Sequence, residues 1–201
     1  VLFQQRKVTR AADVCLRRAV ELQEKRIRRD DGTLEGMPAH QCAQSYKQLA
    51  ETSKDAGAVD ESLRWYQKSI ALHGELFEQF QNFRRVNYHQ PDYLGAYYAV
   101  CLAAGRYAVE VLHLDMARSS YQRLYEARKH YAEHHDTNNG FAYSTAAAAD
   151  MLGGVYLMQH AFEHAKPLVE TAVTELERLL PTETISKKGN RLEYASAWLH
   201  M

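Results

Sequence analysis

The chain has 201 residues, of which 46% are hydrophobic and 25% charged, a balance typical of a folded soluble protein with a sizeable core. Its 25 basic residues equal its 25 acidic residues, so the net charge gives no indication of a nucleic acid or an anionic membrane as partner. The cysteines Cys15, Cys42 and Cys101 match no metal or disulfide spacing, and we interpret them as buried thiols in a reducing cytoplasm.

The chain starts with VLFQ, which is typical of the remnant of an engineered viral 3C-protease site. We therefore treat residues 1–4 as a tag remnant and expect one domain over residues 5–201. Apolar residues three and four positions apart, among them Cys15 and Leu22, predict a first helix over residues 8–29. No aromatic residue interleaves with the basic residues of this helix, so we interpret them as a solvated face and do not favour nucleic-acid binding.

Segments rich in Gly, Pro, Asn and Asp divide the rest of the chain, and the stretches between them show helical rather than strand periodicity. We expect a last unpaired helix over residues 191–200, which gives about eight helices and an all-α fold. Asp60 is the predicted N-cap of the second helix in the first hairpin. The most apolar stretch contains Arg106 and Glu110, so we expect a buried helix there and no membrane span. The three predicted hairpins cover residues 39–85, 91–134 and 140–180.

Each hairpin has a small residue in its first helix and another, twelve positions later, in its second. Gly153, followed by Gly154, lies inside a predicted helix, where glycine costs about 1 kcal/mol relative to alanine. We expect the packing gained where the two helices cross closely to offset this cost. The predicted crossing residues are Ala50 with Ser62, Gly105 with Ala117, and Gly153 with Ala165.

Three segments resemble the tetratricopeptide (TPR) repeat: Tyr46-x2-Leu49-Ala50 with Ser62-x3-Tyr66, Cys101-x2-Ala104-Gly105 with Ala117-x3-Tyr121, and Ala149-x2-Leu152-Gly153-x2-Tyr156 with Ala165-x3-Val169. The repeats are long, because 55 residues separate Ala50 from Gly105 and 48 separate Gly105 from Gly153, whereas the family period is about 34. The tryptophan and the closing proline of the family pattern are missing. The resemblance implies a right-handed α-solenoid of antiparallel helix hairpins.

The resemblance also implies that the first helices of the hairpins line a concave groove that binds a protein or peptide without catalysis. We expect Lys47 and Arg106 to bind an acidic group or a chain terminus, and Leu102, Met151 and Met158 to contact apolar side chains. A regulatory sensor that binds a small peptide or metabolite is the alternative, and self-association or flanking domains in a longer chain stay open. The predicted groove residues are Lys47, Gln48, Glu51, Lys54, Tyr98, Leu102, Arg106, Tyr143, Asp150, Met151, Gly154 and Met158.

One motif could carry catalysis. His130-x-x-Glu133-His134 matches the inverted zinc-peptidase pattern, with Glu126 one turn earlier as a potential third ligand. Histidines are also common at the polar C-terminal end of a helix, which is the interpretation we favour here and for the pair His160 and His164. The sequence thus leads us to expect no catalytic residue, no metal and no cofactor, with a zinc hydrolase as the least favoured function.

Overall fold

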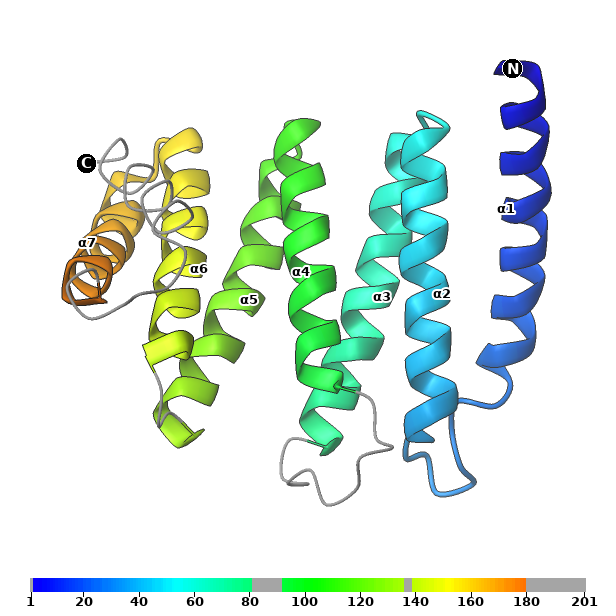
Figure 1. Ribbon diagram of the computed structural model, residues 1–201, viewed down its shortest axis with the longest axis horizontal. Helices are drawn as coiled ribbons and strands as arrows, with labels where there is room; N and C mark the ends of the chain where they lie inside the picture. Colours follow the sequence, from blue (N-terminus) through cyan, green and yellow to red (C-terminus); the bar gives the residue numbers. More distant parts are fainter. Residues whose placement is uncertain (1, 81–91, 136–138, 180–201) are drawn as a thin grey trace. The chain divides into compact units, whose positions relative to one another are not determined.

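The structure is a computed structural model that describes residues 2–80, 92–135 and 139–179 (Figure 1), without the side chains of residues 2–10, 12, 134, 135 and 139–141. The described residues form only helices, apart from an isolated antiparallel bridge between Arg28 and Leu34, and the expected all-α class is confirmed for them. None of these helices is both long and apolar enough to cross a bilayer. The helix predicted over 191–200 lies outside the described residues. The helices are α1 (Leu2–Glu24), α2 (Gly36–Asp55), α3 (Val59–Phe80), α4 (Tyr93–Glu110), α5 (Leu114–His135), α6 (Asn139–Met158) and α7 (Phe162–Leu179).

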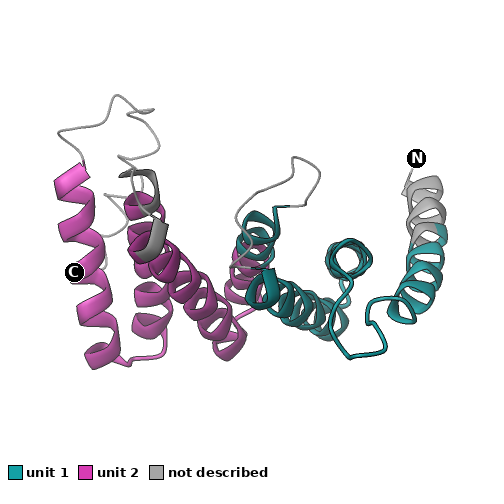
Figure 2. Cartoon of the chain, turned by 90° about the horizontal axis from the view of Figure 1, so that it is seen from below, with its two compact units in different colours: residues 1–100 teal, residues 101–201 magenta. Residues whose placement is uncertain are grey.

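The chain divides into two compact units, residues 1–100 and residues 101–201, which Figure 2 shows in different colours. The boundary falls inside α4, so the first unit contains α1 to α3 and the start of α4. The second unit contains the rest of α4 and α5 to α7. Each unit is described separately below.

In the first unit, the antiparallel helices α2 and α3 pack against each other, and α1 packs against α2. The core between them combines aliphatic, small and aromatic side chains. Burial of this apolar surface is the main stabilising contribution to the unit. The buried core residues are Val20, Leu34, Ala39, Cys42, Ala43, Tyr46, Leu49, Leu72 and Leu76.

The helix α1 ends at Glu24, five residues before the end predicted from the sequence. The residues after it form a tight loop, in which the N–H of Arg29 donates to the carbonyl of Thr33 and the N–H of Glu35 donates to that of Ile27, at 2.9 and 2.8 Å. The Asp31 carboxylate accepts hydrogen bonds from the N–H and the hydroxyl of Thr33. These bonds compete with the helix, so the arginines of this segment do not extend it.

The buried face of α1 also differs from the predicted stripe. Val20 is buried and Leu16 packs against the core, whereas Cys15 and Leu22 are exposed. The prediction that all three cysteines are buried is therefore wrong for Cys15, while Cys42 and Cys101 are buried. The sequence alone could not distinguish the two faces, because each carries apolar residues at helical spacing.

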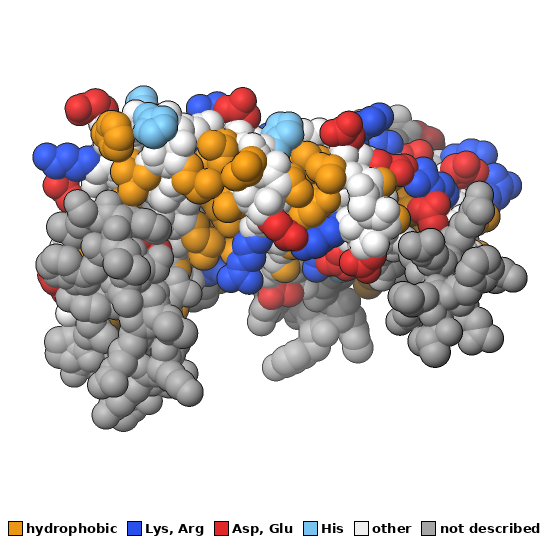
Figure 3. Space-filling model, turned by 90° about the horizontal axis from the view of Figure 1, so that it is seen from above, with side chains coloured by type: hydrophobic (Ala, Val, Ile, Leu, Met, Phe, Trp, Pro, Cys, Tyr) orange, Lys and Arg blue, Asp and Glu red, His pale blue; other side chains and the backbone are white. Residues whose placement is uncertain are grey.

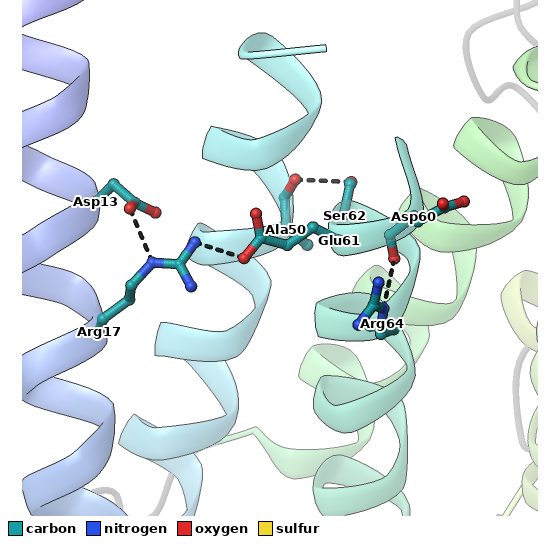
Figure 4. Close-up of polar contacts among 7 residues, drawn as sticks. All are labelled: Asp13, Arg17, Ala50, Asp60, Glu61, Ser62 and Arg64. Atoms are coloured by element: carbon teal, nitrogen blue, oxygen red, sulfur yellow. Dashed lines mark hydrogen bonds and ion pairs between the residues drawn. The ribbon is translucent and has the colours of Figure 1, made fainter. Parts of the chain in front are cut away.

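Polar side chains fix α1 against the hairpin of α2 and α3 (Figure 4). The Arg17 guanidinium lies between the carboxylates of Asp13, one turn earlier, and Glu61 on α3, with N–O distances of 2.8 and 2.5 Å. These two hydrogen bonds, Asp13 first, raise the pKa of Arg17 further above its usual range. At the other end of α1, Glu24 accepts a hydrogen bond from the Tyr46 hydroxyl, and Lys68 lies 3.7 Å from the same carboxylate.

The second unit contains a core built largely of small and β-branched residues between α6 and α7. Alanines of α6 bring the two helices close, and the branched side chains of α7 fill the space beside them. Tyr143 and Leu168 pack against this cluster from its edge. Its buried members are Ala146, Ala149, Val169, Ala172, Val173 and Leu176.

Three helix–helix turns share one backbone geometry. Gly57, Leu112 and His160 all adopt the left-handed conformation, with φ of 75°, 58° and 57°. In each turn this residue donates its N–H to the carbonyl three positions earlier, and the next residue donates to the carbonyl five positions before itself. This is the Schellman arrangement, which satisfies the last carbonyls of the first helix. In every hairpin the left-handed residue follows the first small residue by seven positions and precedes the second by five.

The helices also approach closely at the predicted crossing residues, although not always through the expected partner. The Ser62 hydroxyl donates to the carbonyl of Ala50 at 2.8 Å. A Cβ on Gly153 would lie 2.9 Å from Cγ2 of Val169 and 3.6 Å from the carbonyl of Ala165, and a Cβ on Gly105 would overlap the Tyr121 ring. The nearest neighbour of each glycine is therefore one turn further along than the alanine that the sequence suggested.

A further difference concerns the start of α3. Asp60 lies inside the first turn rather than at the N-cap, because α3 begins at Val59 and the N–H of Ser62 bonds to the carbonyl of Ala58. The carboxylate of Asp60 still lies where the positive end of the helix dipole favours a negative charge.

Candidate binding surface

The polar face of α2 carries four of the predicted groove residues. Gln48 and Glu51 are exposed, and Lys47 and Lys54 are half-buried. The ammonium of Lys47 lies 3.6 Å from the carboxylate of Glu51, one turn along the helix. Because Lys47, Glu51 and Lys54 follow one another at helical spacing, they form a mixed-charge strip that a polar or charged partner could contact.

The predicted residues of α4 differ from one another in accessibility. Arg106 is exposed and Leu102 half-buried, one turn apart. Tyr98, by contrast, is only 7% exposed. Arg106 is therefore accessible at the surface, whereas the burial of Tyr98 differs from the exposed position expected of a groove residue.

In the second unit, Met158 is 43% exposed, whereas Met151 and Gly154 are half-buried. Asp150 was predicted to face outward but is only 3% exposed. Tyr143 is half-buried and packs against the core between α6 and α7. The most exposed residue of this set is therefore Met158, at the C-terminal end of α6.

The described residues carry both signs of charge on the face shown in Figure 3, where hydrophobic side chains gather over the middle of the view. Several large apolar side chains of the described residues are exposed, including Val14 on α1, Leu112 in the turn after α4, and Phe162 at the start of α7.

The motif His130-x-x-Glu133-His134 lies near the C-terminal end of α5, where His130 and Glu133 are both exposed. The side chain of His134 is outside the described residues. Glu126, the potential third ligand, accepts a hydrogen bond from Gln122 at 2.8 Å. Across the described side chains, no group of three or more His, Cys, Asp and Glu residues is close enough to hold a metal ion.

The second histidine pair does not share a helix. His160 occupies the left-handed position of the turn before α7, so the prediction that it begins a helix together with His164 is wrong. The ring of His164 stacks on Tyr156, with 5.2 Å between the ring centroids. His160 therefore forms part of the turn, and His164 makes an aromatic contact.

Two other histidines, which the sequence analysis did not single out, lie together in the first unit. His73 on α3 is completely buried, and its ring meets that of His40 on α2 edge to face at 5.7 Å between centroids. Burial lowers the pKa of His73 to about 4 and that of His40 in the same direction, so both imidazoles are neutral at pH 7. The sequence could have predicted the burial of His73, because it follows Ser62, Tyr66 and Ser69 at steps of three and four and so lies on the same face of the helix.

One ring nitrogen of each of these histidines is buried without a hydrogen-bond partner among the described residues: Nε2 of His73 and Nδ1 of His40. A buried polar group without a partner costs about 1–3 kcal/mol. Two such atoms on adjacent rings are therefore a costly feature of the core.

Comparisons of the chain with protein families, characterised proteins and solved structures found no match.

Proposed function

We propose that the chain is a non-enzymatic module that binds a protein or peptide through the exposed face of its helical hairpins. The single observation that carries this proposal is the repetition of one hairpin geometry, with the left-handed turn at Gly57, Leu112 and His160 and close crossings at fixed offsets from it. Hairpins built alike along a chain are typical of repeat proteins, which present extended binding surfaces.

We further propose that these hairpins stack as a right-handed TPR-like solenoid. The resemblance of the three segments to the TPR pattern supports this arrangement, as does the packing of α2 on α3 and of α6 on α7. In such an array the first helix of each hairpin, namely α2, α4 and α6, faces the partner. The buried thiols of Cys42 and Cys101 are consistent with the cytoplasmic location expected from the sequence.

The side chains of α2, α4 and α6 suggest the kind of peptide. Lys47, Lys54 and Arg106 supply positive charge, and the half-buried Leu102 and Met151 supply apolar surface. We therefore expect a peptide with an acidic residue or its terminal carboxylate next to an apolar side chain.

A peptide-display library screened against the whole chain tests this function. We expect enrichment of acidic–apolar sequences, and at least a tenfold loss of affinity for a selected peptide in Lys47→Glu/Arg106→Glu. Lys166→Glu is the matched control, because Lys166 is an exposed lysine of α7 paired only loosely with Glu170, at 3.9 Å. A screen without enrichment, or equal loss in the control, contradicts the proposal.

The sensor alternative predicts a different result. A sensor of metabolites should then show a rise in melting temperature with a small molecule alone and no enrichment from the peptide library. A thermal-shift screen on the same protein separates the two functions.

A further inference from the structure

One end of the second unit exposes three large apolar side chains, which we call the turn patch. Leu112, in the turn between α4 and α5, is 73% exposed, while Met158 and Phe162, on either side of the turn between α6 and α7, are 43% and 60% exposed. Figure 1 shows both turns at the same end of their helices. The side-chain amide of Gln159 donates to the Asp115 carboxylate at 3.1 Å, so the end of α6 lies beside the start of α5.

The stability of the fold does not explain the leucine in this patch. Leu112 has φ of 58°, a left-handed conformation that is strained for a residue with a side chain. Glycine avoids this strain, as Gly57 does at the equivalent turn of the first unit. A side chain as exposed as that of Leu112 also gains little from burial. Strained residues of this kind concentrate at functional sites, where binding compensates for their cost.

The other turn of the patch has the same feature. His160 has φ of 57°, and its ring meets that of Phe162 edge to face, with 6.1 Å between the centroids. The side chain at the strained position therefore contacts a member of the patch. Both turns of this end thus combine a left-handed residue that is not glycine with an exposed apolar side chain.

The charges beside the patch indicate the chemistry of a partner. Asp115 and Glu163 are exposed carboxylates in the first turns of α5 and α7. The basic residues Arg118 and Lys166 lie one turn further along these helices, and they pair with Asp115 at 3.2 Å and with Glu170 at 3.9 Å. The edge of the patch is therefore acidic, and lysine or arginine next to apolar side chains would complement it. An anionic membrane fits less well, because its surface repels carboxylates.

We propose that the turn patch binds a basic segment of a partner protein that carries large apolar side chains. This surface goes beyond the proposed peptide-binding function and does not depend on it. The predicted groove carries Lys47 and Arg106 and calls for an acidic peptide, whereas the turn patch calls for the opposite charge. Met158, which the sequence analysis assigned to the groove, belongs to the turn patch by its position at the end of α6.

Three apolar side chains with exposed charges beside them make a small interface. We therefore expect micromolar rather than nanomolar affinity. The contribution of Asp115 and Glu163 should weaken as the salt concentration rises, because exposed charges are screened.

The experiment is a fluorescence-anisotropy titration of the whole chain into a labelled synthetic peptide of leucine and lysine. A peptide with glutamate in place of every lysine is the comparison, and we expect it to bind at least tenfold more weakly. We expect at least a tenfold loss of affinity for the lysine peptide in both Phe162→Ser and Leu112→Gly. Leu112→Gly should nevertheless raise the melting temperature, because it relieves the backbone strain. Weaker binding by a more stable variant is a result that a purely structural role of Leu112 would not give.

Val59→Ser is the matched control. Val59 is an exposed apolar residue two positions after the left-handed Gly57, as Phe162 is two positions after His160, but it belongs to the first unit. Equal affinity for the two peptides would overturn the proposal, as would unchanged binding in Leu112→Gly and Phe162→Ser or an equal loss in Val59→Ser.

Two further measurements test the other occupants of the patch. Sedimentation of the chain alone would reveal self-association, and co-sedimentation with phosphatidylcholine/phosphatidylserine vesicles would reveal membrane binding. We expect neither. Self-association or vesicle binding that Phe162→Ser abolishes would assign the patch to a second copy of the chain or to a lipid surface, and either result would overturn the proposal.

Discussion

Two hairpins share one backbone geometry but place their glycines differently. They are the hairpin of α2 and α3 in the first unit and that of α6 and α7 in the second. In the first, Gly57 occupies the left-handed turn, and the helices cross where the Ser62 hydroxyl bonds to the Ala50 carbonyl. In the second, His160 occupies the turn, and Gly153 lies at the crossing. The hairpin of α4 and α5 resembles the latter, with Leu112 in the turn.

The two arrangements differ in their energetic cost. A side chain in the left-handed conformation costs about 1–2 kcal/mol, and a glycine inside a helix costs about 1 kcal/mol relative to alanine. The hairpin of α2 and α3 avoids both costs, because a glycine occupies its turn and a serine its crossing, whereas that of α6 and α7 accepts both. The backbone geometry of turn and crossing is therefore the constant feature, and the residues that meet it differ between the units.

The largest expected effect comes from filling the crossing of α6 and α7. In Gly153→Leu, the new Cβ would lie 2.9 Å from Val169 Cγ2 and 3.5 Å from Leu168 Cβ, and leucine adds three more carbons at this buried position. Overpacking outweighs the gain in helix propensity, so we expect a net loss of about 2–3 kcal/mol in the free energy of unfolding. Urea denaturation followed by circular dichroism measures this loss.

A second substitution locates the strain. Val169→Ala removes the methyl groups nearest to Gly153, so the double variant Gly153→Leu/Val169→Ala should be more stable than the sum of the two single effects predicts. Additive effects, or a Gly153→Leu variant as stable as the wild type, would mean that the helices do not cross closely at this glycine.

Acidification should act on the first unit, through His73. Its pKa is about 4 in the folded chain and about 6.5 when unfolded, so between these values only the unfolded chain binds the proton. Stability should therefore fall as the pH decreases from 6.5 towards 4. The full shift corresponds to about 3 kcal/mol, and we expect about 2 kcal/mol.

Tryptophan fluorescence can follow the first unit alone. The chain has two tryptophans, and Trp198→Phe leaves Trp65 of α3 as the single probe. His73→Gln should flatten the pH dependence, because an amide does not titrate. An unchanged slope in this variant would show that other groups cause the loss of stability.

The sequence was most informative about the hairpins. Apolar periodicity, together with loops rich in Gly, Pro, Asn and Asp, predicted three hairpins, and the described ends of α2 to α7 lie within a few residues of the predicted ones, apart from the predicted end at residue 85, which is outside the described residues. It failed at the end of α1, where Arg28 and Arg29 are good helix formers but Asp31 and Gly32 form a tight loop. Local propensity could not reveal that competition.

The candidate site was harder to predict, because accessibility depends on partners far away in the sequence. Tyr98 and Asp150 occupy positions that a helical wheel places outward, yet both are buried. Cys15 was expected inside, but α1 packs through the neighbouring Leu16 and Val20. The pairing of His40 with His73 requires α2 and α3 to lie side by side, and no local pattern links residues 33 positions apart.

The left-handed turn position holds glycine in the first unit and a residue with a side chain in the second, and substitutions can exchange the two. Leu112→Gly should stabilise the chain by about 1 kcal/mol, since the left-handed conformation is strained for leucine and free of strain for glycine. Gly57→Leu should destabilise it by a similar amount, although a Cβ there would meet no atom within 4 Å. Thermal unfolding of the two variants measures both effects, and shifts of the same sign would contradict the assignment of the strain to backbone conformation.

The smallest effect concerns the polar crossing in the first unit. Ser62→Ala removes the hydroxyl that donates to the carbonyl of Ala50 and keeps a small side chain at a fully buried position. One hydrogen bond of this kind contributes about 0.5–1.5 kcal/mol, so we expect a loss of about 1 kcal/mol. Ser119→Ala is the control, because the Ser119 hydroxyl bonds only to Met116 of its own helix and is exposed, so its removal should change stability little. If both substitutions have the same effect, the hydroxyl of Ser62 does not stabilise the crossing, and the first hairpin depends on small residues alone, as the hairpin of α6 and α7 does.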